Sequence, residues 1–578
     1  MNRRDRAVVA VLVLVLVVLA GALALPRQAA APQAEEPTPD ATVPPRVVFR
    51  EGVVGTATSV TPVTARTRAE RALVGLVFSG LVRLGPGTTY QPDLAESWSV
   101  DETGKEWTFT IRDGAAWHDG VPVTAVDVVF TVNALKSPDA AGAGAGAWAD
   151  VTVEAVDTRT VRLTLGVPIA GVLALATQPL MPAHLLADVP FADLATSDYA
   201  RLPVGSGPFA MTDMDATGAT LVPASGLLPP EMEDPSGSLA PSQTMDSLAT
   251  PIPQATAGAP APYLDEMQVR FYPDETTLAD ALRSGAVDAA SGLSTTMLEA
   301  LKAEPDLARN AYPTTTLSTV LLNLRPSHKE LRDPNVRKAL LGAIDRDALV
   351  ADTLGGNATR ADTLVPPGSL AYDSAPAGTV AYDRKAATKA LQNAGWSKKG
   401  GRWQAPGAKA AYSMEIISVP QGANTRLAAV AAEVRDAWVA FGFDATLVEV
   451  KGTDLAKRLR AGDFTAAVVD IAEGLEPDLY PLLATSQVRA SGTNLAGYQD
   501  PKLDPLLEAA RKPGTPEERA AAWTALLADL GERLPLLPLA WNDEVMLSRG
   551  LDGVTTRLIA DTGDRYWDVL AWRLAADR

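Results

Sequence analysis

Alternating apolar and polar positions identify the first strands in the body of the chain. Residues 107–112 (WTFTIR) and 161–165 (VRLTL) alternate with a period of two, which is typical of antiparallel strands with one buried face. Between them, Thr124 and Asp127 have capping-box spacing before an apolar stretch, so a helix is expected to begin there. The pattern predicts a mixed region of helices and strands.

The second half of the chain has a more regular order of elements. Asp333 and Pro334 supply an N-cap and a first-turn proline, and apolar residues at helical spacing then predict a helix ending near residues 355–356. Residues 412–419, 444–450 and 464–471 are predicted strands, with predicted helices at 425–441 and 454–460. This alternation indicates a βαβαβ unit with a parallel sheet. A further capping box at Thr515 predicts a helix with an apolar face of Trp523, Leu526, Leu527 and Leu530.

An acidic segment follows the last strand of this unit. In open parallel sheets, ligands bind beyond the carboxyl ends of the strands. Residues 472–480 (AEGLEPDLY) occupy that position and contain Glu473, Glu476 and Asp478. The sequence therefore predicts that a ligand lies near these carboxylates.

The N-terminal residues indicate export. Residues 1–6 are basic, and residues 7–25 form an apolar run that is long enough to cross a bilayer and has no polar face. We expect a signal peptide or an uncleaved signal-anchor helix over residues 1–25, with the rest of the chain outside the cytoplasm. Residues 26–45, rich in Pro and Ala, are a predicted tether.

Two internal segments lack any regular period. Residues 140–147 are almost all Ala and Gly, which predicts a flexible loop. From about residue 211 to residue 262, Pro, Ser, Ala, Thr and Met replace the alternation of apolar and polar positions. An irregular or disordered insertion is expected there.

Composition excludes several classes of protein. The 578 residues include 51 Lys and Arg, 69 Asp and Glu, and no Cys, with a formal net charge of −18. The acidic balance argues against nucleic-acid binding, which needs clustered cations. Absence of Cys excludes thiol catalysis, disulfides and cysteine-bound metal centres. The three His residues are scattered, so no metal site and no cofactor are expected.

Blocks in this order resemble a known family: YQPDLAESW (90–98), WTFTIRDGAAWHDGVPV (107–123), PVGSGPF (203–209), PYLDEMQVRFYPDETTLADALRSGAVDAASG (262–292) and LNLRPSHKELRDPNVRKALLGAIDRDALV (322–350). They resemble the extracytoplasmic solute-binding proteins of ABC importers, specifically the oligopeptide- and dipeptide-binding type. The resemblance implies an α/β, two-lobed periplasmic-binding-protein-like fold, the large three-segment variant of type II, whose lobes close over a ligand by a hinge.

The same resemblance implies domain boundaries. Lobe I is expected to comprise residues 46–90, 203–318 and 540–578, with an additional subdomain at residues 91–202. Lobe II is expected to comprise residues 319–539. The chain would therefore pass between the lobes more than once.

Two departures from the family pattern affect the expected function. Relatives on Gram-positive surfaces usually carry a lipobox cysteine, whereas this chain has none, so the apolar run is a candidate anchor. Peptide binders commonly continue the strand at 464–471 into Trp-x-x-Asp, whose Asp pairs with the ligand's α-amino group. Here Asp470 occupies the Trp position and Glu473 the Asp position. The resemblance thus retains a carboxylate for an amine-bearing ligand but loses its aromatic companion.

Six residues are candidate ligand contacts. Glu473 could pair with a ligand ammonium, which is costly to desolvate without a partner, and Asp470 and Glu476 could tune the local field. The resemblance adds Glu51 and Gly52, in a loop expected to lie in the cleft, and Asn494. The alternatives are solvated loop carboxylates and ordinary turn chemistry.

We therefore expect a non-enzymatic, monomeric binding protein, extracytoplasmic at the cell surface or in the periplasm, that delivers a peptide or an amine-bearing small molecule to an ABC permease. Its partners would be that ligand and the permease, and no nucleic acid. Two alternatives stay open. One is a sensor or scaffold that kept the fold and lost its ligand, and the other is a hydrolase.

Overall fold

The computed structural model describes residues 46–85, 89–139, 145–224, 263–369, 371 and 379–575. Nearly all of these belong to one compact unit, Val47–Arg578. The predicted signal or anchor at 1–25, the tether at 26–45 and most of the predicted loop at 140–147 lie outside the described residues. No helix among the described residues is long and apolar enough to cross a membrane.

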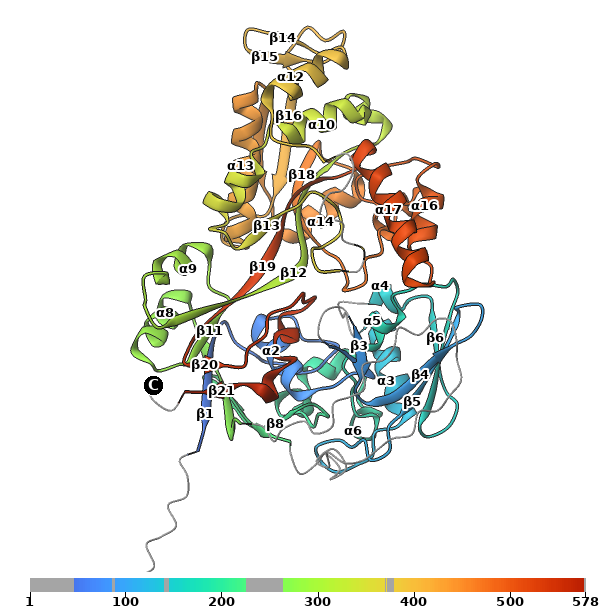
Figure 1. Ribbon diagram of the computed structural model, residues 1–578, viewed down its shortest axis with the longest axis vertical. Coiled ribbons are helices and arrows are strands. Elements are labelled where there is room, and N and C mark those ends of the chain that lie inside the picture. Colours follow the sequence, from blue (N-terminus) through green and yellow to red (C-terminus); the bar gives the residue numbers. More distant parts are fainter. Residues whose placement is uncertain are drawn as a thin grey trace, which may run out of the picture. The chain divides into compact units, whose positions relative to one another are not determined.

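An 11-stranded mixed sheet forms the centre of this unit (Figure 1). Its strands follow the order β17-β16-β18-β12-β19-β11-β1-β10-β9-β8, and β13 pairs with β19 outside this path. The strands are β1 (Val48–Val54), β8 (Phe209–Asp215), β9 (Gly218–Pro223), β10 (Glu266–Tyr272), β11 (Ala289–Ser291), β12 (Leu307–Leu322), β13 (Ala358–Arg360), β16 (Ser413–Ser418), β17 (Asp444–Glu449), β18 (Ala466–Ala472) and β19 (Leu537–Arg549).

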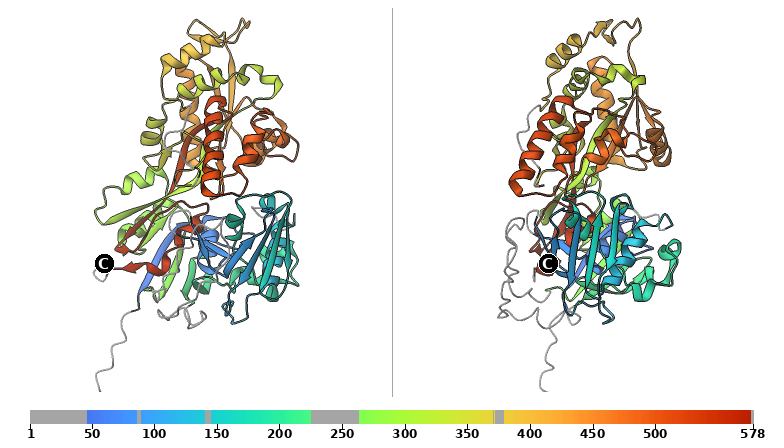
Figure 2. Two further views of the ribbon diagram at one scale, coloured as in Figure 1. Left: turned by 45° about the vertical axis from the view of Figure 1, so that its right-hand side comes forward. Right: turned by 90° about the vertical axis from the view of Figure 1, so that its right-hand side faces the viewer.

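Two large apolar cores divide the unit into two lobes (Figures 1 and 2). The core of lobe I contains Phe49, Trp117 and Trp572, and the core of lobe II contains Trp438 and Trp541. Strands β12 and β19 pair antiparallel and run through both lobes. Their register shifts between Pro313 and Leu317, which is where the chain leaves one core and enters the other.

Lobe II contains the predicted βαβαβ unit. Helix α13 (Thr425–Phe441) follows β16, and α14 (Gly452–Ala461) lies between β17 and β18. Both β17 and β18 pair parallel to β16, which confirms the predicted parallel arrangement. Helix α13 begins where the Asn424 side chain accepts a hydrogen bond from the Leu427 N–H, and it ends at Gly442, whose φ of 112° favours glycine.

The expected subdomain of lobe I contains a separate sheet of four strands, β4-β5-β7-β6. The predicted strands at 107–112 and 161–165 are β5 (Glu106–Ile111) and β7 (Thr160–Leu165), and they pair antiparallel as expected. Helix α3 (Ala125–Lys136) begins with the predicted capping box of Thr124 and Asp127. The other two strands are β4 (Ala95–Val100) and β6 (Val151–Ala155).

The remaining elements flank these sheets. In lobe I they include α2 (Arg68–Val77), β2 (Val82–Leu84), β3 (Tyr90–Pro92), α5 (Val172–Ala176), α6 (Ala183–Leu186), α8 (Glu275–Ser284), α9 (Thr295–Leu301), the 3-10 helix η6 (Thr562–Tyr566), β20 (Leu551–Asp552) and β21 (Arg573–Leu574). In lobe II they include α10 (Pro334–Gly342), α12 (Arg384–Asn393), β14 (Ser397–Lys399), β15 (Arg402–Gln404), α15 (Tyr480–Leu483), α16 (Asp504–Ala510) and α17 (Pro516–Arg533). Helix α17 has the predicted capping box, and its four predicted apolar residues are buried.

Two predictions about these elements are wrong. The helix that begins at Pro334 ends at Gly342 rather than near residue 355, because Asp345 caps a second, short helix, α11 (Arg346–Ala348). The irregular insertion does not begin at residue 211. Residues 209–223 form the antiparallel strands β8 and β9, which extend the central sheet beside β10. Residues 225–262 lie outside the described part of the chain.

Candidate functional site

The loop after β18 lies on the side of lobe II that meets lobe I. The Ala170 N–H of lobe I donates a 2.9 Å hydrogen bond to the carbonyl of Arg511 in lobe II. A Cβ built on Gly171 would lie 3.6 Å from the Cβ of Glu476. The segment of lobe I at Ala170 and Gly171 thus approaches lobe II, and the acidic residues after β18 lie beside this junction.

Asp470 is held by partners within lobe II. Its carboxylate accepts a 2.7 Å hydrogen bond from Ser318 on β12 and forms an ion pair with Arg426 at the start of α13. Arg426 also donates to the side-chain oxygen of Asn542 on β19 at 2.8 Å. The charge of Asp470 is therefore compensated by a cation before any ligand is present.

Two more carboxylates of the loop are also paired. Glu476 forms an ion pair of 2.5 Å with Arg519, and Asp478 forms one of 2.8 Å with Arg511. The Arg511 guanidinium also lies 4.5 Å from the centre of the Tyr480 ring. Both arginines belong to the region of α16 and α17, so this pair of helices fixes the loop against lobe II.

Glu473 differs from these neighbours. Its backbone N–H donates to the carbonyl of Thr315 on β12 at 2.9 Å, which extends the β12–β18 pairing by one residue. Within the described residues, the Glu473 carboxylate makes no hydrogen bond and no ion pair. It is half-buried, and burial together with the negative charge of Asp478 raises its pKa to about 8. A nearby cation favours the ionised form of such an unpaired, partly desolvated carboxylate, and the pair then compensates the cost of its burial.

Lobe I contributes groups that the sequence did not identify. Tyr90 is half-buried, and burial and the nearby charge of Glu476 raise the pKa of its hydroxyl. The Arg557 guanidinium stacks 4.6 Å from the centre of the Trp567 ring and donates to the Gly85 carbonyl at 3.0 Å. Burial lowers the pKa of Arg557 to about 10. Tyr90 could have been found from the sequence, because it is the first residue of the block YQPDLAESW. Nothing in the sequence around Arg557 distinguishes that residue.

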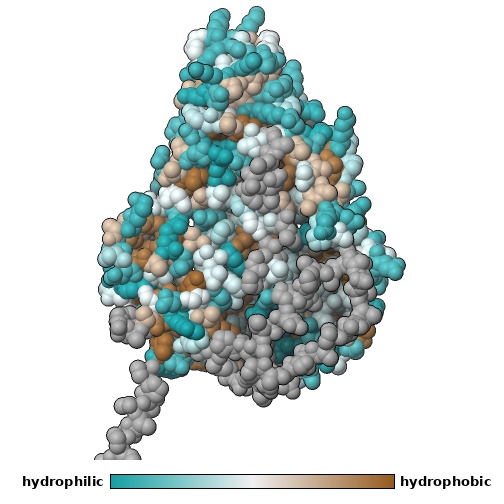
Figure 3. Space-filling model, viewed as in Figure 1, coloured by the Kyte–Doolittle hydropathy of each residue, from teal (hydrophilic) through white to brown (hydrophobic). Residues whose placement is uncertain are grey.

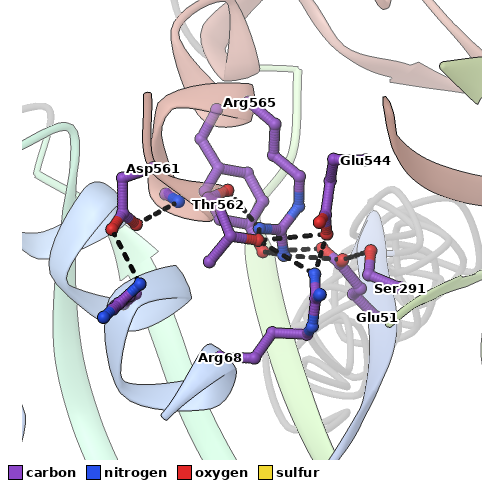
Figure 4. A network of polar contacts seen from close by, with 10 residues as sticks. Glu51, Arg68, Ser291, Glu544, Asp561, Thr562 and Arg565 are labelled. Carbon is purple, nitrogen blue, oxygen red and sulfur yellow. Dashed lines mark hydrogen bonds and ion pairs between the residues drawn. The ribbon is translucent and has the colours of Figure 1, made fainter. Parts of the chain in front are cut away.

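Glu51 and Gly52 were expected in a loop of the cleft, and this prediction is wrong. Both residues lie inside strand β1. Glu51 is fully buried, and its carboxylate accepts hydrogen bonds from Ser291, Arg565 and Tyr566 (Figure 4). A Cβ built on Gly52 would lie 2.2 Å from Leu278 Cδ1, so any larger residue there would force the Leu278 side chain to move. The Glu51 carboxylate is thus occupied by hydrogen bonds within lobe I, and Gly52 packs against Leu278.

Figure 4 shows a second charged pair beside this one. Arg68, in the first turn of α2, forms an ion pair with Glu544 on β19, and Thr562 of η6 hydrogen bonds to both. Burial lowers the pKa of Arg68 to about 10. The network connects β1, β11, β19 and η6, so it fixes the C-terminal segment onto lobe I.

Asn494 is also held internally. Its side chain is buried and donates to the carbonyls of Ala484 and Tyr498 at 3.2 Å and 2.8 Å, and it accepts from the Tyr498 N–H at 3.1 Å. These contacts close a turn, which is the alternative expected for this residue. Of the six predicted ligand contacts, Glu473 is the one whose functional group has no partner among the described residues.

The comparisons with known proteins decide the family. The model for bacterial extracellular solute-binding proteins, family 5 Middle, matches residues 89–491. The chain belongs to family 5 of the extracellular solute-binding proteins. This confirms the resemblance on which the expected fold was based, and the two-lobed α/β fold is the one observed.

Relatives extend over nearly the whole chain. Oligopeptide-binding protein AppA of Bacillus subtilis is 23% identical over 517 residues, covering 87% of this chain and 88% of AppA. The structure of Bacillus subtilis AppA in complex with a nonapeptide matches with a TM-score of 0.68 and 21% identity, covering 92% and 100% of the two chains. The structure of NikZ from Campylobacter jejuni in complex with Ni(L-His) matches with a TM-score of 0.68 and 22% identity, and it also covers 92% of this chain and 100% of NikZ. One fold therefore holds very different ligands.

Proposed function

We propose that this solute-binding protein captures a ligand with a protonated amine between its lobes and delivers it to an ABC permease. A peptide or another amine-bearing small molecule has the required group. The observation that carries the proposal is the Glu473 carboxylate, which has no partner among the described residues although Asp470, Glu476 and Asp478 each have an arginine.

The chemistry favours a cation at Glu473 in particular. A ligand ammonium enclosed between two lobes loses its hydration, and this is costly unless a carboxylate accepts its hydrogen bonds. Asp470, Glu476 and Asp478 would have to exchange an existing arginine for the ligand. Glu473 would only release a proton, because its raised pKa of about 8 keeps most of it protonated at neutral pH.

Closure would take place where β12 and β19 cross between the lobes. The pairing of β12 with β19 shifts register between Pro313 and Leu317 of β12, and the ladder is interrupted there. A bend at such a point changes the angle between two cores without repacking either of them. Lobe closure would exclude water from the ligand and present a shape that the permease can recognise.

The proposed location follows from the N-terminal sequence. Residues 1–25 would direct export and either be removed or stay as an anchor, and residues 26–45 would tether the two-lobed unit outside the cytoplasm. Because the chain has no Cys, a lipid attached through cysteine is excluded.

A paired ligand screen tests the proposal. Thermal unfolding of the protein would be measured with a peptide library and with the same peptides acetylated at the amine. We expect stabilisation by some free-amine peptides and little by their acetylated forms, with about 2.7 kcal/mol at a ligand concentration 100 times Kd. Equal stabilisation by both forms would contradict the role of the amine. No stabilisation by any amine would favour the ligand-free scaffold, and peptide turnover would favour the hydrolase.

A further inference from the structure

One end of lobe II is strongly basic although the chain as a whole is acidic. It consists of α12, β14, β15 and their connections, at the top of Figure 1. Residues 383–409 contain one acidic side chain, Asp383, whereas the full chain has 69 acidic and 51 basic residues. The basic side chains of this segment are Arg384, Lys385, Lys389, Lys398, Lys399, Arg402 and Lys409. We call this set the basic end of lobe II.

Most of these charges are available to a partner. Lys385, Lys389, Lys399 and Lys409 are exposed, and none of them forms an ion pair in the part of the chain that the structure describes. The Asp383 carboxylate is used to cap α12, where it accepts from the N–H groups of residues 385 and 386. Two of the seven are engaged: Arg402 pairs with Asp444, and the Lys398 ammonium donates to the Phe441 carbonyl at 2.9 Å.

A hollow beside Phe441 gathers three of the cations. It is lined by Arg384, Lys385, Thr388, Lys398, Ala440 and Phe441. The Arg384 guanidinium and the Lys398 ammonium both lie over the Phe441 ring, 5.9 Å and 5.8 Å from its centre. The ring thereby holds two cations at one wall of the hollow, with the Lys385 side chain nearby.

Exposed apolar side chains adjoin this hollow in the sequence. Tyr382, next to Asp383, is 46% exposed, and Val439, next to Ala440, is 48% exposed. The same end of the molecule is otherwise largely hydrophilic in Figure 3. Long cationic stems around a few exposed apolar groups suit an interface between water and lipid, where the stems cover apolar surface and the charges reach phosphate.

We propose that the basic end of lobe II binds the anionic headgroups of phospholipids. Clusters of four to eight Lys and Arg are attracted to anionic bilayers, and each contributes on the order of a fivefold gain in affinity. An acidic protein surface fits less well, because Lys is depleted from protein interfaces and five of the seven cations are Lys. The cations are also spread over a helix and a hairpin, which suits an extended anionic surface.

The absence of Cys from the chain allows a site-specific test. Ser397 is exposed on β14, so a Ser397→Cys variant of the full chain takes a single fluorescent label within the basic end. The labelled protein is reconstituted into vesicles that carry a lipid-borne quencher. One set contains phosphatidylcholine alone, and the other contains phosphatidylcholine and phosphatidylglycerol in equal parts. Because the same full chain is present in both sets, any membrane insertion of the N-terminal run is common to them.

We expect strong quenching in the anionic vesicles, weak quenching in the neutral ones, and loss of the difference at high salt. The triple variant Lys385→Gln, Lys389→Gln and Lys399→Gln should lower the contact equilibrium constant by on the order of 100-fold. The matched control replaces Lys302, Lys457 and Lys502, which removes the same charge elsewhere and should retain the quenching.

Three outcomes would overturn the proposal. Equal quenching in both lipid compositions would show that anionic headgroups are not recognised. Equal loss in the control triple variant would show an effect of net charge rather than of this surface. Quenching that occurs in native membranes but not in anionic vesicles made of lipid and the labelled chain alone would assign the basic end to an acidic protein partner instead.

Discussion

The carboxylate of Glu51 and the guanidinium of Arg565 lie 2.9 Å apart, and neither side chain is exposed to solvent. The first lies on β1 and the second in η6, so the pair ties the two ends of the described chain together within lobe I. Such a pair is costly to break, because removal of one partner leaves the other charge buried and uncompensated.

Glu51→Ala should therefore lower the free energy of unfolding by about 3 to 5 kcal/mol. Urea denaturation followed by circular dichroism measures this change. Glu449→Ala serves as the control, because Glu449 is exposed and is expected to change the free energy by less than about 0.5 kcal/mol. A loss below about 1 kcal/mol for Glu51→Ala would mean that the pair contributes little.

Gly52→Ala should destabilise the protein through overpacking. The added methyl would lie 2.2 Å from Leu278 Cδ1 and 3.1 Å from the Tyr272 ring, and Leu278 is fully buried. We expect a loss of about 1 to 3 kcal/mol in the free energy of unfolding. Gly422→Ala is the matched control, since no atom lies within 4 Å of a Cβ built there. Equal stability of the two variants would contradict the packing role of Gly52.

The order of strands and helices in this protein was largely predictable from local pattern. The alternation in 107–112 and 161–165, the capping boxes at Thr124 and Thr515, and the βαβαβ order of lobe II depend on residues close in sequence. The failures have physical reasons. Asp345 interrupts an apolar helical pattern by capping a new helix, and strands β8 and β9 are stabilised by β10, which follows 43 residues after β9 in the chain.

The candidate site was less predictable, because pairing between distant residues decides it. The sequence placed Asp470, Glu473 and Glu476 on one segment, and the family pattern favoured Glu473 as the ligand's partner, but no nearby residue indicated that the other two carboxylates are already paired. Arg426 and Arg519, which neutralise the first and the last, lie more than 40 residues away in the chain. Glu51 was misplaced for the same reason, since its partner Arg565 is 514 residues distant.

Glu473 should make the stability of the ligand-free protein depend on pH. Its pKa is raised from an ordinary 4.5 to about 8 in the folded state. Below pH 4.5 the group is protonated in both states, and between pH 4.5 and 8 the unfolded state releases the proton first. The free energy of unfolding therefore falls as pH rises through this window, by at most about 5 kcal/mol from this group.

The control for this pH dependence is Glu473→Gln, which cannot titrate. As pH rises from 4.5 to 8, the free energy of unfolding of wild type should fall relative to that of Glu473→Gln. Above pH 8 the difference between the two should stay constant. A difference that stays constant from pH 4.5 to 8 as well would show that the Glu473 pKa is not raised.

Ligand binding should release a proton at neutral pH. A ligand ammonium stabilises the ionised form of Glu473, so the carboxyl group, mostly protonated at pH 7, must give up its proton. With a ligand whose amine is of lysine type (pKa about 10.4) and so stays protonated, calorimetry in buffers of different ionisation enthalpy would detect release of nearly one proton per ligand at pH 7 and much less at pH 9. Proton uptake, or no exchange at either pH, would contradict an ammonium at this carboxylate.

The most direct test of the central claim is the affinity of wild type and Glu473→Gln for one amine ligand and for its N-acetylated form. With a ligand whose amine is of lysine type (pKa about 10.4), calorimetry near pH 9, where Glu473 is ionised and the amine is still protonated, should show that Glu473→Gln weakens binding of the free amine by about 1.5 to 3 kcal/mol and leaves the acetylated form nearly unchanged. Glu449→Gln should change neither affinity. Equal affinities of wild type and Glu473→Gln for the free amine would contradict the assignment of Glu473 as the ligand's partner.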